Sequence, residues 1–433
     1  MRTNKNFTIN NLGTFKKKLL KWAASFEEVV WLDSNDNQTS PGNYEAVLAI
    51  EAFTAIKTDY HKAFDKLEEY QKTTADWSFG YLTYDLKNDV EKLSSENFDG
   101  LEFPDLYFFQ PQKLITIRDG IAEFQYLKMV DEEIDTDYHE ILRLEIDSET
   151  TNLETQNVQL ESRILKSAYL EKIEKMQEHI ARGDIYEANL CQEFYANNVQ
   201  IDPLSIFKSL NTISTPPFSA YLKLEEFNLI SASPERYLKK TGEHLLSQPI
   251  KGTARRSTEA REDVEIALEL AKDPKEKAEN VMIVDLVRND LSRIAKKGSV
   301  AVAELCKVYT FQQVHQLISS VTAIIADGIS PVEAIRTSFP MGSMTGAPKI
   351  SAMKIIEELE QTKRGLYSGA VGYFTPEGDF DFNVVIRSIL YNSKNQYLSF
   401  SVGGAITAKS NPEKEYAECL LKAKALREVL TNL

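Results

Sequence analysis

Glutamates and a lysine spaced along two expected helices are the clearest sign of chemistry in this sequence. In NPEKEYAECLLKAKAL, Glu415, Glu418 and Lys422 stand at positions i, i+3 and i+7, so a helix places them on one face. Glu276 and Glu279 repeat the i, i+3 spacing in KEKAENVMIVDL. Two such carboxylate pairs could meet and hold a hard divalent cation such as Mg²⁺, which prefers oxygen ligands. Either pair alone is also typical of an exposed helix surface.

Glycine-rich turns beside expected strands are a second signal. Gly403 and Gly404 end the strand-like run SVGGAI, and residues 341–348 (MGSMTGAP) precede a helix-like run. Turns of this kind expose backbone N–H groups, which favour a carboxylate or a phosphate; ordinary turns are the alternative. Neither segment matches the GxxxxGK[ST] or GxGxxG patterns, so nucleotide binding has little support.

A lysine and a glutamate at strand ends form a third signal. Lys251 follows the apolar run of LLSQPIKGTARR and precedes Gly252 and Thr253. A desolvated lysine has a lowered pKa and can act as a nucleophile. Glu235, in SASPERY, could be a general acid if its environment raises its pKa. A solvated lysine and a Glu235–Arg236 ion pair are the alternative interpretations.

Histidine and cysteine spacing indicates no zinc or disulfide framework. The histidines show neither HxH nor HxxxH spacing, which argues against a histidine-based zinc site. His315, in an apolar-flanked stretch, is either a core histidine or a site residue. The three cysteines, Cys191, Cys306 and Cys419, lie far apart and are expected to be free thiols.

Composition restricts the class of protein. The chain has 433 residues, of which 42% are apolar and 27% charged, as in globular proteins. A formal net charge of −15 repels phosphate, so neither nucleic-acid nor anionic-membrane binding is expected. No signal-peptide core and no run of eighteen apolar residues occurs, so we expect no membrane span and a cytoplasmic location.

The elements that must position these residues divide the chain into three parts. Residues 1–130 mix strands with a helix over 59–72 and a hairpin around Asp119-Gly120; residues 131–164 read as an acidic linker; residues 165–433 form the second structured part. There we expect a helix ending at Gly183, a strand over 227–240, a strand running into a loop over 244–256, helices over 259–295, a three-strand meander over 367–406 and a closing helix capped by Asn411. Irregular alternation of strands and helices predicts an α+β fold with large antiparallel sheets.

Eight sequence blocks, in order, resemble the chorismate-utilising family. They are SASPERY, PIKGTARR, AENVMIVDLVRNDLSR, FPMGSMTGAPK, RGLYSGAVGYF, VVIRS, SVGGAI and NPEKEYAECLLKAKAL, and they span roughly residues 165–428. The family includes the anthranilate synthase large subunit, aminodeoxychorismate synthase component I, isochorismate synthase and salicylate synthase. The resemblance implies a two-lobed sandwich of antiparallel sheets flanked by helices, with residues 165–433 as the chorismate-binding catalytic domain and 1–130 as the N-terminal region of the same fold.

The resemblance also implies roles for individual residues. Glu279 and Glu418 match the family's Mg²⁺ ligands, with Glu276 and Glu415 beside them. The other residues that match substrate-binding positions are Tyr367 and Arg387, for the enolpyruvyl carboxylate; Gly403, Gly404 and Lys422, for the anion site; Thr345 and His315, near the ring; and Thr253.

One position of the resemblance bears on the reaction. Anthranilate synthases carry Ala in a PIAGT block, whereas the aminodeoxychorismate synthases carry Lys, as Lys251 does here. This implies formation of 4-amino-4-deoxychorismate, with Lys251 as nucleophile and Glu235 as general acid. The ammonia is expected from a separate glutamine amidotransferase subunit, because no cysteine here sits in a glutaminase-type turn. Anthranilate synthesis and a catalytically inactive interaction subunit remain the alternatives.

Two positions depart from the family pattern. Glu187 in GDIYEANL occupies a position that is usually Gln in the amino-transferring enzymes and Lys in the water-adding ones. The absence of Lys argues against isochorismate or salicylate synthesis, but the role of Glu187 does not follow from the sequence. The stretch WLDSN departs from the LLES pattern of tryptophan-inhibited anthranilate synthases, so tryptophan inhibition is not expected.

Overall fold

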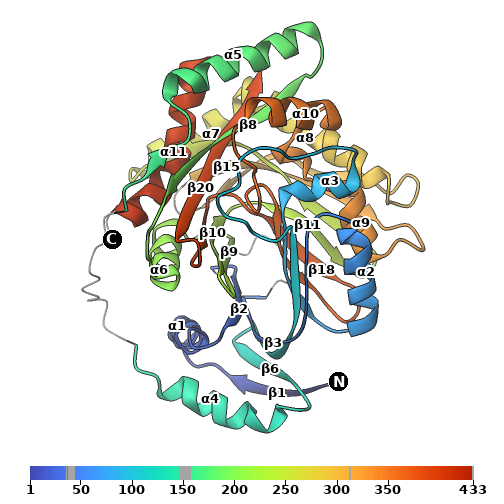
Figure 1. The fold of residues 1–433 in the computed structure, drawn as a ribbon, viewed down its shortest axis with the longest axis vertical. Coiled ribbons are helices and arrows are strands. Elements are labelled where there is room, and N and C mark those ends of the chain that lie inside the picture. The colour runs from blue at the N-terminus through green and yellow to red at the C-terminus, as the bar shows by residue number, and fades with distance from the viewer. Residues whose placement is uncertain (36, 38–43, 147–157, 312–313, 432–433) are drawn as a thin grey trace.

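The computed structural model describes residues 1–35, 37, 44–146, 158–311 and 314–431, and it shows helices arranged around the outside of twisted antiparallel strands (Figure 1). All strand pairings given below are antiparallel, which confirms the α+β class with large antiparallel sheets. The strands belong to one hydrogen-bonded network with two branches. The two branches supply the two lobes of the predicted sandwich.

The first branch runs from the N-terminal strand to the strands that border the candidate site. In order of pairing it contains β1 (Arg2–Thr8), β6 (Ile121–Leu127), β5 (Leu106–Arg118), β3 (Ala46–Thr58), β2 (Glu28–Asp33), β9 (Phe218–Leu224), β10 (Phe227–Ser233), β19 (Ser388–Asn392), β20 (Tyr397–Thr407) and β8 (Glu187–Ala196), with short β7 (Glu161–Ser162) and β16 (Gly346–Ala347) on β8.

The second branch leaves the first at β5. It continues through β4 (Ser78–Leu82), β17 (Ala370–Phe374), β18 (Phe380–Val384), β11 (Arg236–Thr241), β12 (His244–Gln248) and β15 (Val314–Ile324), which also pairs with β13 (Ile250–Arg255) and β14 (Ala301–Thr310).

Two long strands, β3 and β5, belong to both branches. Val47–Ile50 of β3 lie beside β2, whereas residues 54–58 pair only with β5, whose first residues 106–109 also pair with β4. The register shifts between Ala52 and Thr54, and Glu51 has a φ of +57°. A bulge of this kind bends and twists a strand, so these strands carry the chain from one branch to the other.

The helices cover the outer faces of this network (Figure 1). They are α1 (Leu12–Ala23), α2 (Ala63–Thr74), α3 (Lys87–Val90), α4 (Ile134–Arg143), α5 (Lys166–Arg182), α6 (Pro203–Ser214), α7 (Ala260–Lys272), α8 (Pro274–Ser292), α9 (Pro331–Ser338), α10 (Lys349–Leu359) and α11 (Pro412–Thr431), with 3₁₀ turns η1 (Tyr84–Leu86), η2 (Asp131–Glu133) and η3 (Gly342–Met344).

Alternation along the strands divides the interior into two hydrophobic cores. Val30 of β2 faces the core that it shares with the second branch, while its neighbours Val29 and Trp31 face the core that contains residues of α1, α6 and α11. Successive side chains of a strand point to opposite faces, so inner strands of the first branch such as β2 are buried on both sides, whereas β1 at its edge is largely exposed. This accounts for the nearly continuous apolar runs in the inner strands.

Several local predictions are confirmed. Asp119 and Gly120, with φ of +52° and +71°, form the tight turn between β5 and β6, as a two-residue hairpin turn with both residues left-handed requires. Helix α5 ends at Gly183, whose φ is +85°. Asn411 caps α11 by accepting a hydrogen bond from the Lys414 N–H at 3.1 Å.

Three predicted strand patterns were wrong in detail. The strand expected over 227–240 is two strands, β10 and β11, interrupted at Pro234 and Glu235, and the loop expected after β12 is strand β13. The three-strand meander is four strands in two hairpins, because Val385–Arg387 separate β18 from β19 and send them to different branches. Both interruptions place site residues at strand ends.

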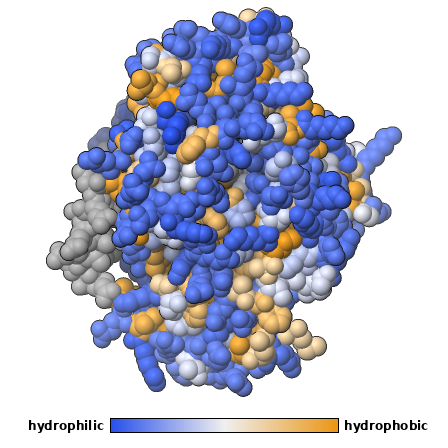
Figure 2. All heavy atoms as spheres, in the orientation of Figure 1, coloured by the Kyte–Doolittle hydropathy of each residue, from blue (hydrophilic) through white to orange (hydrophobic). Residues whose placement is uncertain are grey.

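The segment expected to be an acidic linker contains structure. Residues 147–157 of it lie outside the described residues, but η2 and α4 precede them, and Ile134 and Ile141 of α4 are buried. The surface in Figure 2 is mostly hydrophilic, with hydrophobic residues in scattered groups. Within the described part of the chain, no helix is both long and apolar enough to cross a membrane.

The contact of β4 with β17 and β5 gives a stability prediction. Gly80 lies opposite Gly372, and a Cβ at Gly80 would lie 1.9 Å from the Tyr107 carbonyl oxygen. We expect Gly80→Ala to destabilise the protein by about 2–3 kcal/mol or more, because backbone must move. Thermal unfolding measures this loss. Gly13→Ala is the control, because its Cβ would meet nothing closer than 3.8 Å; equal melting temperatures for Gly80→Ala and wild type would contradict the packing described here.

Candidate active site

Glu235 lies in the break between β10 and β11. Its side chain is buried, and its backbone is fixed on both sides: its carbonyl accepts from the Val384 N–H at 3.0 Å, and its N–H donates to Ser233 Oγ at 3.3 Å. Burial raises the pKa of Glu235 to about 7, and a hydrogen bond from Ser343 and the charge of Lys251 oppose part of that rise. A carboxyl with this pKa is partly protonated near neutral pH and suits a general acid.

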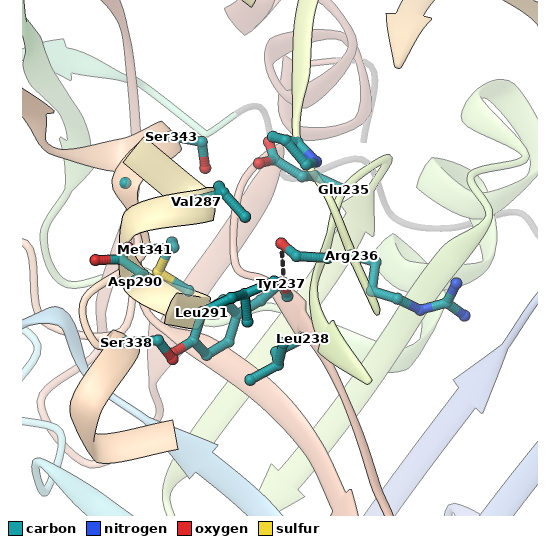
Figure 3. A pocket seen from close by; sticks show the side chains of 13 residues that line it. Glu235, Arg236, Tyr237, Leu238, Val287, Asp290, Leu291, Ser338, Met341 and Ser343 are labelled. Atoms are coloured by element: carbon teal, nitrogen blue, oxygen red, sulfur yellow. Dashed lines mark hydrogen bonds between the residues drawn. The ribbon is translucent and has the colours of Figure 1, made fainter. Parts of the chain in front are cut away.

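A small pocket opens beside Glu235 (Figure 3). Glu235 and Ser343 lie at one end of it, and Tyr237 and Ser338 lie at the other, where the Tyr237 and Ser338 hydroxyls are 2.7 Å apart. Val287 and other residues of α8 form one wall, and the strand that carries Glu235 forms the opposite wall. The acid therefore lies where an apolar helix face excludes much of the water.

Lys251 lies among carboxylates. It is half-buried in β13 and has no hydrogen-bond or ion-pair partner among the described residues. Its positive charge nevertheless acts on five glutamates, which come from β8, the β10–β11 break, α8 and α11: it opposes the burial that raises the pKa of Glu187, Glu235, Glu276 and Glu279, and it contributes to the lowered pKa of Glu418. The sequence-predicted nucleophile and acid are thus brought together with the predicted metal ligands.

The carboxylates of α8 come from its first turns. Asp273 caps this helix by accepting from the N–H groups of Lys275 at 2.8 Å and Glu276 at 3.0 Å, which fixes where the helix begins. Burial raises the pKa of Glu279 to about 7, with Lys251 opposing the rise. Within the described part of the chain, Glu279 Oε1 is buried without a hydrogen-bond donor.

Helix α11 brings its carboxylates to the same place. Glu415 is buried, and Lys275 Nζ lies 3.7 Å both from Glu415 Oε1 and from Glu279 Oε1. Burial alone would lower the pKa of Lys275, but attraction to the four glutamates of the two helices outweighs it and raises the pKa. The predicted meeting of the two carboxylate pairs therefore occurs, around a lysine that the sequence reasoning missed.

Glu418 is neutralised by its own helix. Lys422 Nζ lies 2.8 Å from Glu418 Oε1 and donates to the Gly403 carbonyl at 2.9 Å. Burial raises the pKa of Glu418, but Lys422, together with Lys275 and Lys251, more than offsets this, and the net pKa is below its usual value. The pair ties α11 to β20.

The two glycines of β20 have different spatial requirements. A Cβ at Gly403 would lie 2.1 Å from the Leu190 carbonyl oxygen, so close pairing of β20 with β8 requires glycine there. A Cβ at Gly404 would instead lie 3.6 Å from both Lys422 Nζ and Glu415 Oε2. The bare backbone at Gly404 leaves room beside the charged groups, as an anion-binding position needs.

Tyr367 and Arg387 lie beside this region. The Tyr367 hydroxyl is 3.4 Å from Cys191 Sγ in a buried position. Arg387 has a φ of +53° in the break between β18 and β19, where its carbonyl accepts from the Ala232 N–H at 3.1 Å. Burial lowers the pKa of Arg387, with Tyr367 and Glu418 opposing, and its guanidinium has no ion-pair partner among the described residues. A desolvated, unpaired guanidinium suits an anionic ligand.

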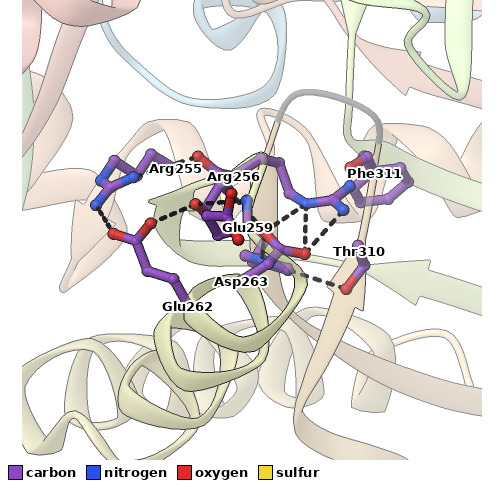
Figure 4. Close-up of polar contacts among 9 residues, drawn as sticks. Arg255, Arg256, Glu259, Glu262, Asp263, Thr310 and Phe311 are labelled. Carbon is purple, nitrogen blue, oxygen red and sulfur yellow. Dashed lines mark hydrogen bonds and ion pairs between the residues drawn. The ribbon is translucent and has the colours of Figure 1, made fainter.

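Three predicted substrate residues are not placed among the carboxylates. His315 is buried in β15, with Nε2 3.0 Å from Asp263 Oδ1 and Nδ1 2.9 Å from Thr310 Oγ1. Figure 4 shows Asp263 and Thr310, the two partners of His315, and Arg256, which also binds Asp263. The Thr345 hydroxyl is buried and donates to the Gly342 carbonyl at 3.2 Å, and Thr253 is exposed. For His315 and Thr345, local hydrogen bonds already occupy the polar atoms.

The carboxylates of α8 and α11 are the kind of ligand that Mg²⁺ takes, but among the described residues they are not arranged around one metal position. Among the described residues, no three Asp, Glu, His or Cys side chains stand close enough together to hold a metal ion. Two glutamates, Glu279 of α8 and Glu415 of α11, lie 3.7 Å from one ammonium group, however, and Glu279 Oε1 has no hydrogen-bond donor in the described structure. Carboxylate oxygens are the ligands that Mg²⁺ takes, usually a few together with water.

Glu187 adds a further carboxylate that sequence reasoning noted without a role. It lies at the start of β8 and is 1% exposed, and its Oε2 has no hydrogen-bond donor in the described structure. Burial raises its pKa, and Lys251 opposes the rise.

Lys275 had a weak signal in the sequence, namely its i, i+4 spacing from Glu279, but that spacing is common on helix surfaces.

Comparison with known proteins identifies the family. A family described as chorismate binding enzyme matches residues 17–428. The chain belongs to that family. Anthranilate synthase component 1 of Thermus thermophilus is 32% identical over 385 residues, which are 87% of this chain and 82% of that protein. Aminodeoxychorismate synthase component 1 of Bacillus subtilis is 33% identical over 363 residues, which are 82% and 76% of the two chains.

Solved structures of the chorismate binding enzyme family confirm the fold. Anthranilate synthase component I from Streptococcus pneumoniae superimposes with a TM-score of 0.78 at 26% identity, covering 90% of this chain and 93% of that one. MenF, the menaquinone-specific isochorismate synthase from Escherichia coli, has the same TM-score at 16% identity, covering 99% and 94%. The predicted family and sandwich fold are thus confirmed, while relatives with two reaction names are equally similar in sequence.

The buried Glu235 gives a pH prediction. Folding raises its pKa from 4.5 to about 7, so the folded protein binds a proton that the unfolded chain releases, and stability falls as pH rises through this window. Glu235→Gln lacks this loss. We therefore expect its stability relative to wild type to rise by about 2–3 kcal/mol between pH 5 and pH 8.

Urea unfolding at several pH values measures the difference. The exposed Glu174, on α5, supplies the control Glu174→Gln, whose difference from wild type should not depend on pH in this range. A Glu235→Gln difference that is flat across the same range would show that Glu235 ionises normally.

Proposed function

We propose that this enzyme transfers ammonia to C4 of chorismate and forms 4-amino-4-deoxychorismate. The observation that carries the proposal is the position of Lys251, a half-buried amine without an ion-pair partner among the described residues, which lies within electrostatic range of a buried acid, Glu235, and of the carboxylates of α8 and α11. Anthranilate synthases resemble this chain throughout but carry Ala in the PIKGT block. A nucleophilic amine at this position therefore favours the amination that passes through a lysine adduct.

The substrate carboxylates would be held by the cationic and backbone donors of the site. Arg387, with Tyr367 beside it, would bind the enolpyruvyl carboxylate, because its half-buried guanidinium has no ion-pair partner in the described structure. Lys422 and the backbone of Gly403 and Gly404 would complete the anion site. Thr253, Thr345 and His315 would lie around the ring, with His315 oriented by Asp263.

The chemistry then divides one substitution into two. The neutral Lys251 amine attacks C2, the ring double bonds shift, the C4–O bond breaks, and Glu235 gives its proton to the departing hydroxyl, which leaves as water. Ammonia next forms a bond to C4, the double bonds shift back, and the C2–N bond to Lys251 breaks. Covalent catalysis of this kind replaces one difficult step by two easier ones.

Mg²⁺ belongs to the proposal as the cofactor. Glu279 and Glu418 would be its ligands, with Glu276 and Glu415 beside them, and it would offset the charge of the ring carboxylate. The orphan oxygen of Glu279 supports this assignment. Glu187 and Lys251 remain free of the metal in this scheme.

The proposal includes a partner subunit. Relatives from Bacillus subtilis and Escherichia coli are named component 1 of aminodeoxychorismate synthase, which supports a second component that supplies ammonia from glutamine, a glutamine amidotransferase. The three cysteines are free, and Cys191 and Cys419 are buried, which supports a role without a glutaminase thiol and a reducing, cytoplasmic setting.

Product analysis tests the reaction and the partner together. With chorismate, Mg²⁺ and an ammonium salt, we expect the purified chain to accumulate aminodeoxychorismate without releasing pyruvate. With glutamine in place of ammonium, and no second subunit, we expect no product. Mass spectrometry and a pyruvate assay read both results. Anthranilate with one equivalent of pyruvate would favour the first alternative, and no turnover at all would favour an inactive interaction subunit.

Replacement of Lys251 tests the nucleophile. We expect Lys251→Ala to bind chorismate about as well as wild type, because the carboxylate-binding groups stay, but to form product at least about 100-fold more slowly. Lys208→Ala, at an exposed position of α6, is the control and should keep full rate. Wild type with chorismate and Mg²⁺ but no ammonia should show a covalent adduct on Lys251. If wild type shows no adduct and the Lys251→Ala enzyme is fully active, Lys251 is not the nucleophile.

A further inference from the structure

Lys275 lies where the carboxylates of two helices converge. Its Nζ is 3.7 Å from Glu279 Oε1 on its own helix, α8, and 3.7 Å from Glu415 Oε1 on α11. Glu276 and Glu418 also attract its charge. One ammonium group therefore lies between carboxylates of two different helices, Glu279 and Glu415, with Glu276 and the Lys422-paired Glu418 within electrostatic range.

The contacts of Lys275 are loose. Both distances exceed the 2.7–3.2 Å range of N–H···O hydrogen bonds, and the side chain is 48% exposed, so it lies at the solvent side of the cluster. Its partner atoms are much less exposed: the Glu279 side chain is 13% exposed and that of Glu415 is 5% exposed. The ammonium can thus move outward into water while the carboxylates stay in place.

The helix itself does not favour a lysine here. Lys275 is the second residue after the Asp273 cap of α8, where the helix dipole favours acidic side chains and disfavours basic ones. Lysine four residues before glutamate is also the less favourable order for a helical ion pair. Attraction to Glu415 of the neighbouring helix adds an interaction that helix α8 alone cannot provide.

We propose that Lys275 is a displaceable counter-ion: its ammonium group holds the carboxylates of α8 and α11 together until a divalent cation takes its place. The proposal rests on the metal site of the proposed function and adds a residue to it. It accounts for two observations at once, the convergence of four glutamates and the lack of a ready-made metal cluster among the described residues. Binding of the cation then requires Lys275 to swing into solvent.

Two opposite effects follow from removing this charge. Without a metal, four carboxylates repel one another with one less positive charge nearby, so the folded state loses stability. With a metal, the cation no longer competes with an ammonium group, so it binds more tightly. A residue that only stabilised α8, or that helped to hold the metal, would not produce both effects.

The test is Mg²⁺ binding to Lys275→Met, which keeps a flexible side chain of similar length without charge. Calorimetric titration of the metal-free full chain with MgCl₂, without chorismate, should show at least about tenfold tighter binding than wild type. Without metal, the variant should melt at a lower temperature than wild type, and saturating Mg²⁺ should raise its melting temperature by more.

Two further variants make the test specific. Lys277→Met removes an exposed lysine two residues along the same helix and should change neither quantity. Adding Glu279→Gln to Lys275→Met should abolish the tight binding, because it removes a carboxylate that the ammonium and the metal share. Undiminished binding in this double variant would place the cation elsewhere and overturn the proposal.

The outcomes separate this inference from the reaction. Equal or weaker Mg²⁺ binding by Lys275→Met, or no Mg²⁺ binding by either protein, would overturn the counter-ion proposal even if aminodeoxychorismate is formed. Tighter binding together with anthranilate as product would support the counter-ion and refute the proposed amination.

Discussion

Repulsion among carboxylates is the constraint around which the site of this protein is built. Glutamates from β8, from the β10–β11 break and from two helices come within electrostatic reach of one amine, that of Lys251. Like charges at short range in a half-buried place destabilise a fold unless cations or protons offset them. Here both occur: Lys275 and Lys422 neutralise the helix carboxylates, while Glu235 and Glu279 keep pKa values near 7 and so carry protons part of the time.

The remainder of the fold holds these charged side chains close together. Asp273 and Asn411 begin α8 and α11 at fixed residues, so the glutamates of both helices fall on the faces that meet. Close pairing of β20 with β8 at Gly403 fixes the strand surface next to these glutamates. The breaks at Glu235 and Arg387 lie between strands that pair with each other, β10 with β19 and β11 with β18, which gives the same region a buried acid and a half-buried cation. Anionic substrates are then met by positive groups within a protein whose net charge is strongly negative.

The sequence predicted which residues form the site better than it predicted which of them lie close together in space. Helical spacing placed Glu415, Glu418 and Lys422 on one face, and the resemblance of ordered blocks led to the family that the comparisons confirm. The break at Glu235 was missed although Pro234, which cannot donate to a strand ladder, precedes it. The separation of β18 from β19 was missed because the apolar run at 384–386 continues across it, and pairing with distant strands decides where each strand stops. Lys275 was missed for a similar reason: its significance depends on Glu415, which lies far away along the chain and near only in the folded protein.

The pairing of β4 with β17 affects how the chain can be assembled during synthesis. All five residues of β4 are buried, yet the partner of Leu82 is Ala370, which leaves the ribosome roughly 290 residues later. At about 5–20 residues per second, this strand waits on the order of 15–60 s for its second neighbour. Through that interval the nascent N-terminal third exposes an apolar edge that other unfinished chains can pair with. Because β3 and β5 join both branches, the N-terminal third cannot complete its own core in the meantime.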